Sequence, residues 1–473
     1  MAWIHRTGGA GGEHPRPHRW STREITVSDS ATLRRAIAGT AIGNFTEWYD
    51  FGVYGFLATT IARVFFPGGA SGSPAQLIGA FATLAAAFVV RPFGGMLFGP
   101  LGDRIGRKRV LMMTILLMAL ATTATGLLPG YATAGIWAPV LLLLLRLVQG
   151  FSTGGEYVGA MIYIGEHAPD RRRGALSGWL PFGTLSGYIC GAALVTGLTS
   201  ALPAQAMTTW GWRLPFLVAA PLSVVGLYIR MRLEETPAFA RLERRERAVS
   251  TVRRLRETVV RQWRPLLVCV GLVLTFNVTN YMLTGYLPAY FADVLHAPQT
   301  PALALIVAVM VILVGAVTFV ARLSDRIGRK PIMWVGCGLL VFGAVPAFLL
   351  LRYGGGYVLP FAGVLLIGLM LLCFNSTEPS SLPTLFPTNI RYGSLGVGFN
   401  LSVAAFGGTT PLISEALVAG TGNDLAPAFY LVFAGLVGVV SVALLPEPAG
   451  KRLPGSPPAA ATEEEARELA RSG

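Results

Sequence analysis

The 473-residue chain is too apolar and too sparsely charged to be a series of water-soluble domains. Apolar residues form 53% of it and charged residues 13%, and a soluble fold could not cover that much apolar surface with so few charges. The same apolar content excludes a disordered chain, so a polytopic membrane protein remains.

Twelve stretches are long enough to cross a bilayer, which takes about 20 mostly apolar residues in a helix. They are continuous rather than alternating, which excludes a closed β-barrel. We therefore predict an all-α polytopic membrane protein with twelve transmembrane helices in two six-helix, pseudo-symmetric bundles. The predicted spans are residues 35–64, 74–98, 110–129, 136–163, 174–199, 212–231, 265–291, 302–322, 331–351, 356–380, 393–418 and 426–446.

Lys and Arg residues are divided unevenly between the two sets of loops. One set holds twenty-one of them, whereas the other holds only Arg352. Basic loops stay on the cytoplasmic side, so we predict a protein of the cell membrane with both termini in the cytoplasm. The basic loops are 103–109, 170–173, 232–264, 324–330 and 387–392.

The longest loop, 232–264, carries ten Arg and five Glu and divides the chain into halves. We interpret it as a solvated linker that lies near anionic lipid headgroups. The predicted parts are a cytoplasmic tail (1–33), a six-helix bundle (34–231), the charged cytoplasmic linker (232–264), a second six-helix bundle (265–446) and a cytoplasmic tail (447–473).

The two halves repeat a loop motif. Asp-Arg-Ile-Gly-Arg-Lys occurs at 103–108 and again at 325–330, and a weaker echo relates 169–174 to 387–393. Two echoes at nearly the same offset indicate duplication, which is typical of secondary transporters. The glycine allows a tight turn, and the aspartates, Asp103 and Asp325, can pair with arginines or with a helix N-terminus. We expect these contacts to form a latch that breaks when the bundles rock.

The loop at 99–108 resembles the signature of the major facilitator superfamily, although the second copy has Ala321 where that family usually has Gly. Further motifs resemble its metabolite:proton symporter branch, and most closely the proline/glycine betaine:proton symporters. The resemblance covers residues 24–446. The motifs lie at 43–55, 91–95, 146–160, 210–216 and 234–239 for the branch, and at 277–283 and 386–392 for the narrower group.

The resemblance implies a secondary active transporter that imports a small zwitterionic osmolyte, such as proline or glycine betaine, with protons by alternating access. An organic-acid:proton symporter of the same branch is the alternative. Glu378 adds an acid that the osmolyte carriers are not expected to have, and no sustained heptads follow residue 463 to support osmotic regulation through a coiled coil.

An enzyme embedded in the membrane is not supported by any motif. The sequence contains no HExxH, no Ser-His-Asp order and no phosphate-binding loop. The four cysteines show neither disulfide nor metal-site spacing, so we expect no cofactor and no metal. The expected partners are the substrate, protons and the lipid bilayer. Nucleic acid is not expected, because the net charge of +14 falls between apolar helices, and no protein partner is inferred.

Ionisable residues inside predicted spans are costly and are therefore candidates for function. Glu47 and Asp50 lie one helical turn apart, at the depth that we estimate for Arg146. We expect the two acids to couple transport to protons, with a static salt bridge as the alternative. Arg146 and the aromatic or amide groups of Trp48, Tyr281 and Asn277 are the predicted substrate ligands.

A second set of charged residues is estimated to lie nearer the cytoplasm. We predict that these residues form a cytoplasmic gate, while ordinary anchoring at the headgroup level is the alternative. The predicted gate residues are Asp103, Arg107, Arg91, Glu156, Glu166, Arg173, Asp325 and Arg329.

Overall fold

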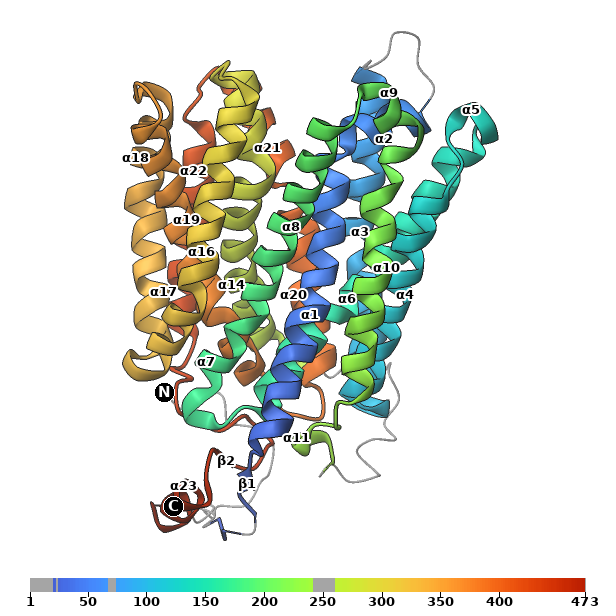
Figure 1. Ribbon diagram of the computed structural model, residues 1–473. Helices are drawn as coiled ribbons and strands as arrows, with labels where there is room; N and C mark the ends of the chain where they lie inside the picture. The colour runs from blue at the N-terminus through green and yellow to red at the C-terminus, as the bar shows by residue number, and fades with distance from the viewer. Residues whose placement is uncertain (1–19, 23, 67–73, 241–259, 473) are drawn as a thin grey trace.

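A computed structural model describes residues 20–22, 24–66, 74–240 and 260–472. Within them, eleven helices are long and apolar enough to cross a membrane. The first helix, α1 (Ser30–Phe56), is less apolar because it carries Glu47 and Asp50. It corresponds to the one predicted membrane helix that is missing from these eleven. Figure 1 shows the helices of the two halves side by side. The predicted all-α fold with twelve membrane helices in two bundles is confirmed.

The first half contains six long helical segments and several short ones. A π-helical segment, η2, leads into the last long helix. The elements are β1 (Thr26–Val27), α1, α2 (Ala58–Phe65), α3 (Pro74–Ile105), α4 (Arg107–Leu127), α5 (Tyr131–Ala134), α6 (Trp137–His167), η1 (Asp170–Arg172), α7 (Arg173–Ser177), α8 (Trp179–Ala201), α9 (Ala204–Ala206), η2 (Met207–Gly211), α10 (Arg213–Met231) and α11 (Pro237–Ala240).

The second half repeats the plan, with π-helical segments interrupting three of its spans. Such segments are frequent where helices serve a function. The elements are α14 (Trp263–Tyr281), η3 (Met282–Tyr286), α15 (Leu287–Ala289), η4 (Tyr290–Val294), α16 (Gln299–Ile327), α17 (Arg329–Gly338), η5 (Leu339–Gly343), α18 (Ala344–Tyr353), α19 (Val358–Ser381), η6 (Leu382–Leu385), α20 (Arg391–Ser402), η7 (Val403–Gly407), α21 (Thr410–Thr421), α22 (Ala426–Leu444), β2 (Ala459–Ala460) and α23 (Glu463–Ser472).

In both copies of the repeated motif, the connection between the two helices is shorter than the hydropathy pattern predicts. A single residue, Gly106, separates α3 from α4, and Gly328 alone separates α16 from α17. Their φ angles of 109° and 97° belong to glycine, as expected for the tight turn. Asp103 therefore lies in the last helical turn rather than in a loop. Hydropathy indicates the apolar part of a helix, and polar residues extend it further.

Close packing inside the first half depends on glycines of α8. A Cβ atom added to Gly183 would lie 2.4 Å from the Ala41 carbonyl oxygen of α1, and one added to Gly187 would lie 2.2 Å from that of Phe45. The two helices can approach this closely only because the side chain is missing.

The segments that flank the bundles meet beneath one end of the molecule, which we call the tail end (Figure 1). There β1 pairs in parallel with β2, with Thr26 opposite Ala459 and Val27 opposite Ala460. Two segments of the predicted domain division lie outside the described residues. They are residues 1–19 of the first tail and residues 241–259 of the linker. The predicted division of the chain there stays a prediction.

We expect Gly187→Val to destabilise the protein. Overpacking a close helix contact costs about 1–3 kcal/mol, so the thermal unfolding temperature in detergent should fall. Gly197→Val is the matched control, because nothing lies within 4 Å of a Cβ atom at this position of the same helix. Equal unfolding temperatures for the two variants would contradict this account of the α1–α8 contact.

Candidate functional site

Buried positive charges are systematically compensated. Seven arginines are buried in the described part of the chain, and each forms an ion pair with a carboxylate. A buried ion needs such a partner to replace its lost hydration. The pairs are Arg91–Glu47, Arg107–Asp103, Arg107–Glu166, Arg146–Asp50, Arg173–Asp170, Arg230–Glu156, Arg329–Asp325 and Arg391–Glu166.

Glu47 on α1 pairs with Arg91 on α3, with 2.6 Å between Oε1 and Nη2. The guanidinium carbon lies 5.1 and 5.2 Å from the ring centres of Phe51 and Phe88. The sequence estimate placed Arg91 near the gate because the predicted span ended at residue 98. The helix continues well beyond that point, which moves Arg91 to its middle and away from the gate.

Asp50 turns towards a different partner. Its Oδ2 lies 3.2 Å from Nη1 of Arg146 on α6, and the Arg146 guanidinium carbon lies 3.9 Å from the ring centre of Tyr54. The sequence placed Asp50 and Arg146 at one depth, and the structure brings them together. It does not leave Glu47 as a surplus acid beside them, since Glu47 has its own arginine. A role of Arg146 in substrate binding stays a prediction.

Glu156 belongs to a third pair inside the first half rather than to the gate. Nη1 of Arg230, on α10, donates to Oε2 of Glu156 over 2.8 Å, and Nη2 donates to Oε1. The Thr114 hydroxyl also donates to Oε2 over 2.6 Å. Sequence reasoning missed Arg230 because it closes a predicted span, where basic residues usually act as interfacial anchors.

Aromatic rings from the two halves meet between the bundles. The Tyr281 ring of α14 has its centre 6.5 Å from that of Trp48 and 5.5 Å from that of Phe88. The structure therefore brings together Trp48 and Tyr281, the two aromatic residues predicted as substrate ligands. Asn277 lies one turn before Tyr281 on α14 and so on the same side of that helix.

Several buried polar atoms around these rings lack a hydrogen-bond partner. Buried polar groups are normally satisfied, so such a set requires an explanation. Three donors and one acceptor together suit a ligand that carries both charges. The atoms are Nε1 of Trp48, Nδ2 of Asn277, Nε of Arg91 and Oε2 of Glu47.

At the tail end, the repeated aspartates join the two halves symmetrically. Asp103, from the first half, accepts from two amides that begin α20, over 3.2 and 2.8 Å. Asp325, from the second half, accepts from two amides near the start of α7, both over 2.8 Å. A carboxylate is stabilised at a helix N-terminus by its free amides and positive dipole end. Both contacts expected of the motif occur. The amides belong to Tyr392 and Gly393, and to Gly174 and Ala175.

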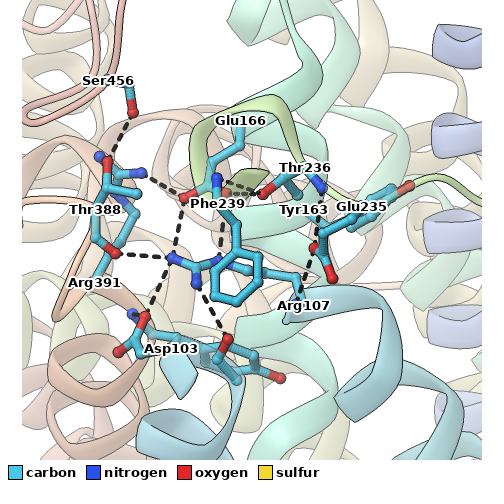
Figure 2. Close-up of polar contacts among 12 residues, drawn as sticks. Asp103, Arg107, Tyr163, Glu166, Glu235, Thr236, Phe239, Thr388, Arg391 and Ser456 are labelled. Carbon is cyan, nitrogen blue, oxygen red and sulfur yellow. Dashed lines mark hydrogen bonds and ion pairs between the residues drawn. The ribbon is translucent and has the colours of Figure 1, made fainter. Parts of the chain in front are cut away.

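Glu166 makes a further connection between the two halves at the tail end, as Figure 2 shows. We call this contact between the halves the seam. Its Oε1 lies 2.5 Å from Nη1 of Arg391, in the second half, and its Oε2 lies 3.4 Å from Nε of Arg107. Arg107 in turn donates to the Thr388 carbonyl of the second half over 2.8 Å. One carboxylate thus connects arginines of both bundles. Arg391 and Thr388 were absent from the predicted gate, although both lie in the motif at 386–392.

Two glutamates fix the helices that follow the glycine turns. Glu235 accepts from the amide of Arg107 over 3.0 Å at the start of α4. Glu447 accepts from the amide of Arg329 over 3.0 Å at the start of α17. Burial raises the pKa of the Glu235 carboxyl, and hydrogen bonding from the Thr236 amide and the charge of Arg107 oppose that shift.

The chain after α22 covers the seam. The carbonyl of Lys451 accepts from Arg173 over 2.9 Å, and that of Pro454 accepts from Arg391 over 2.6 Å. This segment therefore contacts arginines of both halves.

Six of the predicted gate residues gather at the tail end, whereas Arg91 and Glu156 lie deeper in the first half. The six form two groups, and the duplication relates Asp103 to Asp325 and Arg107 to Arg329. They are Asp103, Arg107 and Glu166 in one group, and Arg173, Asp325 and Arg329 in the other.

Comparison with known proteins agrees with this architecture. A family model described as Major Facilitator Superfamily matches residues 40–408. The glycine betaine/proline/ectoine/pipecolic acid transporter OusA of Dickeya dadantii (strain 3937) is 43% identical over 457 residues, which cover 94% of this chain and 90% of that protein. The proline/betaine transporter of Escherichia coli (strain K12) is 41% identical over 458 residues, with the same coverage.

A solved structure with the same fold is the proton:xylose symporter XylE bound to 6-bromo-6-deoxy-D-glucose. It superimposes with a TM-score of 0.72 at 18% identity, over 93% of this chain and 99% of that one. At that identity the likeness concerns the fold alone. The resemblance inferred from the sequence motifs is confirmed: the chain belongs to the major facilitator superfamily and is a multi-pass membrane transporter of small molecules.

Proposed function

We propose that the protein imports a small zwitterionic osmolyte, such as proline or glycine betaine, together with protons. The printed names of its relatives support this substrate class. The structural observation that carries the proposal is the neutral, partly unsatisfied site between the halves. Its arginine is already paired, and it offers both donors and an acceptor to a ligand. Such a site suits a ligand of zero net charge.

The substrate would lie beside Trp48 and Tyr281. Their ring faces attract a quaternary ammonium or prolinium nitrogen, which is worth about 2 kcal/mol or more in a desolvated site. Nε1 of Trp48 and Nδ2 of Asn277 would donate to the substrate carboxylate. Both atoms are buried without a hydrogen-bond partner, so the ligand would supply what they lack.

Proton coupling follows from the Glu47–Arg91 pair. Protonation of Glu47 removes the charge that holds Arg91, and the guanidinium is then free to bind the substrate carboxylate. Without the proton, Glu47 and the substrate compete for the same cation. Proton and substrate therefore favour each other's binding, which is the thermodynamic requirement for symport. Asp50, held by Arg146 in the same half, is the second candidate for coupling.

Alternating access would be controlled at the tail end. Asp103, Asp325 and Glu166 hold the halves together there, so the binding site would open to the opposite side. The excess of Lys and Arg in the loops at this end supports a cytoplasmic location for it and for both termini. The lipid bilayer concerned would then be the cell membrane.

An organic-acid substrate is less well supported by the charges. A dianion requires cations that no protein carboxylate neutralises. Arg91, Arg146 and Arg230 are the membrane-embedded cations of the first half, and each already has an acidic partner. Protonation of Glu47 would release one positive charge, which matches a single carboxylate.

We expect Glu47→Gln to lower uphill accumulation of substrate by the contribution of the proton that Glu47 carries, but to preserve exchange of substrate across the membrane. Glutamine keeps the shape of a protonated glutamate, so Arg91 stays available while the coupling proton has no acceptor. The test measures uptake of labelled proline or glycine betaine into proteoliposomes with an inward proton gradient, together with counterflow without a gradient. Glu463→Gln, at a carboxylate whose side chain is 81% exposed, is the control. Accumulation in Glu47→Gln equal to that of the wild type would refute this role.

We expect Trp48→Leu to weaken binding of a betaine. Loss of a cation–π contact worth about 2 kcal/mol raises the KM roughly 30-fold. Trp137→Leu serves as the control, because that indole is 65% exposed at the far end of α6. The measurement is the KM for glycine betaine uptake, with a dicarboxylate tested as a competitor. An unchanged KM, or inhibition by the dicarboxylate but not by proline, would favour the organic-acid alternative.

A further inference from the structure

Glu378 is the exception to the pairing of buried charges. Its side chain, on the last turns of α19, is 2% exposed. Among the residues that the structure describes, no ion pair includes Glu378, and its Oε1 atom has no hydrogen-bond partner. The other buried carboxylates in that part of the chain each face an arginine.

Within the described residues, the helices packed against α19 bring no positive charge to Glu378. The titratable groups that interact with it are Tyr157 on α6 and Cys269 on α14, and both are neutral. Arg329, at the start of α17, donates instead to the Ser380 carbonyl over 3.3 Å and to Asp325 over 3.2 Å. Glu378 therefore lies in a buried position without a compensating cation.

An isolated carboxylate in such a place is too costly to stay ionised, and it takes up a proton instead. A neutral, protonated carboxyl therefore suits the position of Glu378 better than a carboxylate does. A purely structural role does not call for a carboxyl at all, because an apolar side chain would fill this space without the cost of burying a polar group.

The position of Glu378 connects it to the movement of the two halves. Tyr157, its neighbour from the first half, stacks on Phe399 of the second half with ring centres 5.0 Å apart. Tyr157 also interacts electrostatically with Glu47. Separation of the halves at the tail end would part this stack and admit water to Glu378. Hydration would then allow the carboxyl to ionise and release its proton.

We propose that Glu378 is a second proton-binding site of the transporter, filled in the state described and emptied when the halves part at the tail end. The inference rests on the proposed proton symport and extends it. Glu47 would take one proton in the first half, and Glu378 would carry another in the second half. No covalent bond other than the O–H bond of the carboxyl forms or breaks.

The test compares the number of protons that accompany each substrate molecule. Proteoliposomes are given a fixed pH gradient, and the substrate gradient at which net flux reverses is measured for labelled glycine betaine. Glu378→Gln keeps the neutral shape but cannot release a proton, so its reversal point should correspond to one proton fewer than the wild type. Glu415→Gln, an exposed carboxylate on α21 of the same half, should match the wild type.

Equal stoichiometries for Glu378→Gln and the wild type would overturn this inference and leave the proposed symport intact. A wild-type flux that ignores the pH gradient would overturn both. Should the glutamine variant fail to insert, Glu378→Met offers an apolar replacement of similar length, with the same expected loss. In wild-type protein, a carbodiimide, which attacks protonated carboxyls in apolar surroundings, should modify Glu378. An unmodified Glu378 would contradict its protonated state.

Discussion

The pairing of buried charges is the constraint on which the rest of this structure depends. A guanidinium in an apolar environment needs a carboxylate beside it, and every buried arginine of the described chain has one. These pairs therefore decide which helices lie together: Glu47 joins α1 to α3, Asp50 joins α1 to α6, and Glu156 joins α6 to α10. They also provide the chemistry, because a proton that neutralises one acid releases its arginine for another anion. Stability of the first bundle and coupling to protons are in this account two consequences of the same contacts.

Buried charges are also paired in the seam at the tail end, but there the contacts join the two halves of the protein. Asp103 and Asp325 each satisfy an arginine of their own half and the beginning of a helix in the other half. Glycines allow the approach, since a Cβ atom on Gly95 of α3 would lie 2.4 Å from the Gly396 carbonyl oxygen of α20. The contacts are strong individually but can be exchanged for water. Tightly packed interfaces of this kind switch between discrete arrangements rather than deforming gradually, which suits alternating access.

The sequence alone predicts most of this organisation because apolar length and duplication are local signals. It yields the helical membrane fold, the glycine turns and the capping aspartates, and it singles out Trp48 and Tyr281, which the structure brings together. It misplaces Arg91 and Glu156, because depth was counted from the ends of apolar runs, and α3 and α6 extend beyond those runs. It also misses Arg230 and the contacts of the chain after α22, because a charge at the end of a span looks the same whether it is an anchor or a partner. Which acid meets which arginine is a property of the tertiary packing.

The most direct test of the account is the distance between the halves at the tail end. Spin labels at positions 104 and 326, exposed sites on α3 and α16, would report it by pulsed electron resonance, with Cys190 replaced. Neutralising either aspartate should weaken the joined arrangement by about 1–3 kcal/mol and shift the population roughly five- to 150-fold. Asp103→Asn combined with Asp325→Asn should therefore convert a short-distance population into a longer one and impair transport, while Glu463→Gln should leave both unchanged. Identical distances in the double variant and the wild type, with normal transport, would contradict the claim that these aspartates hold the two halves together.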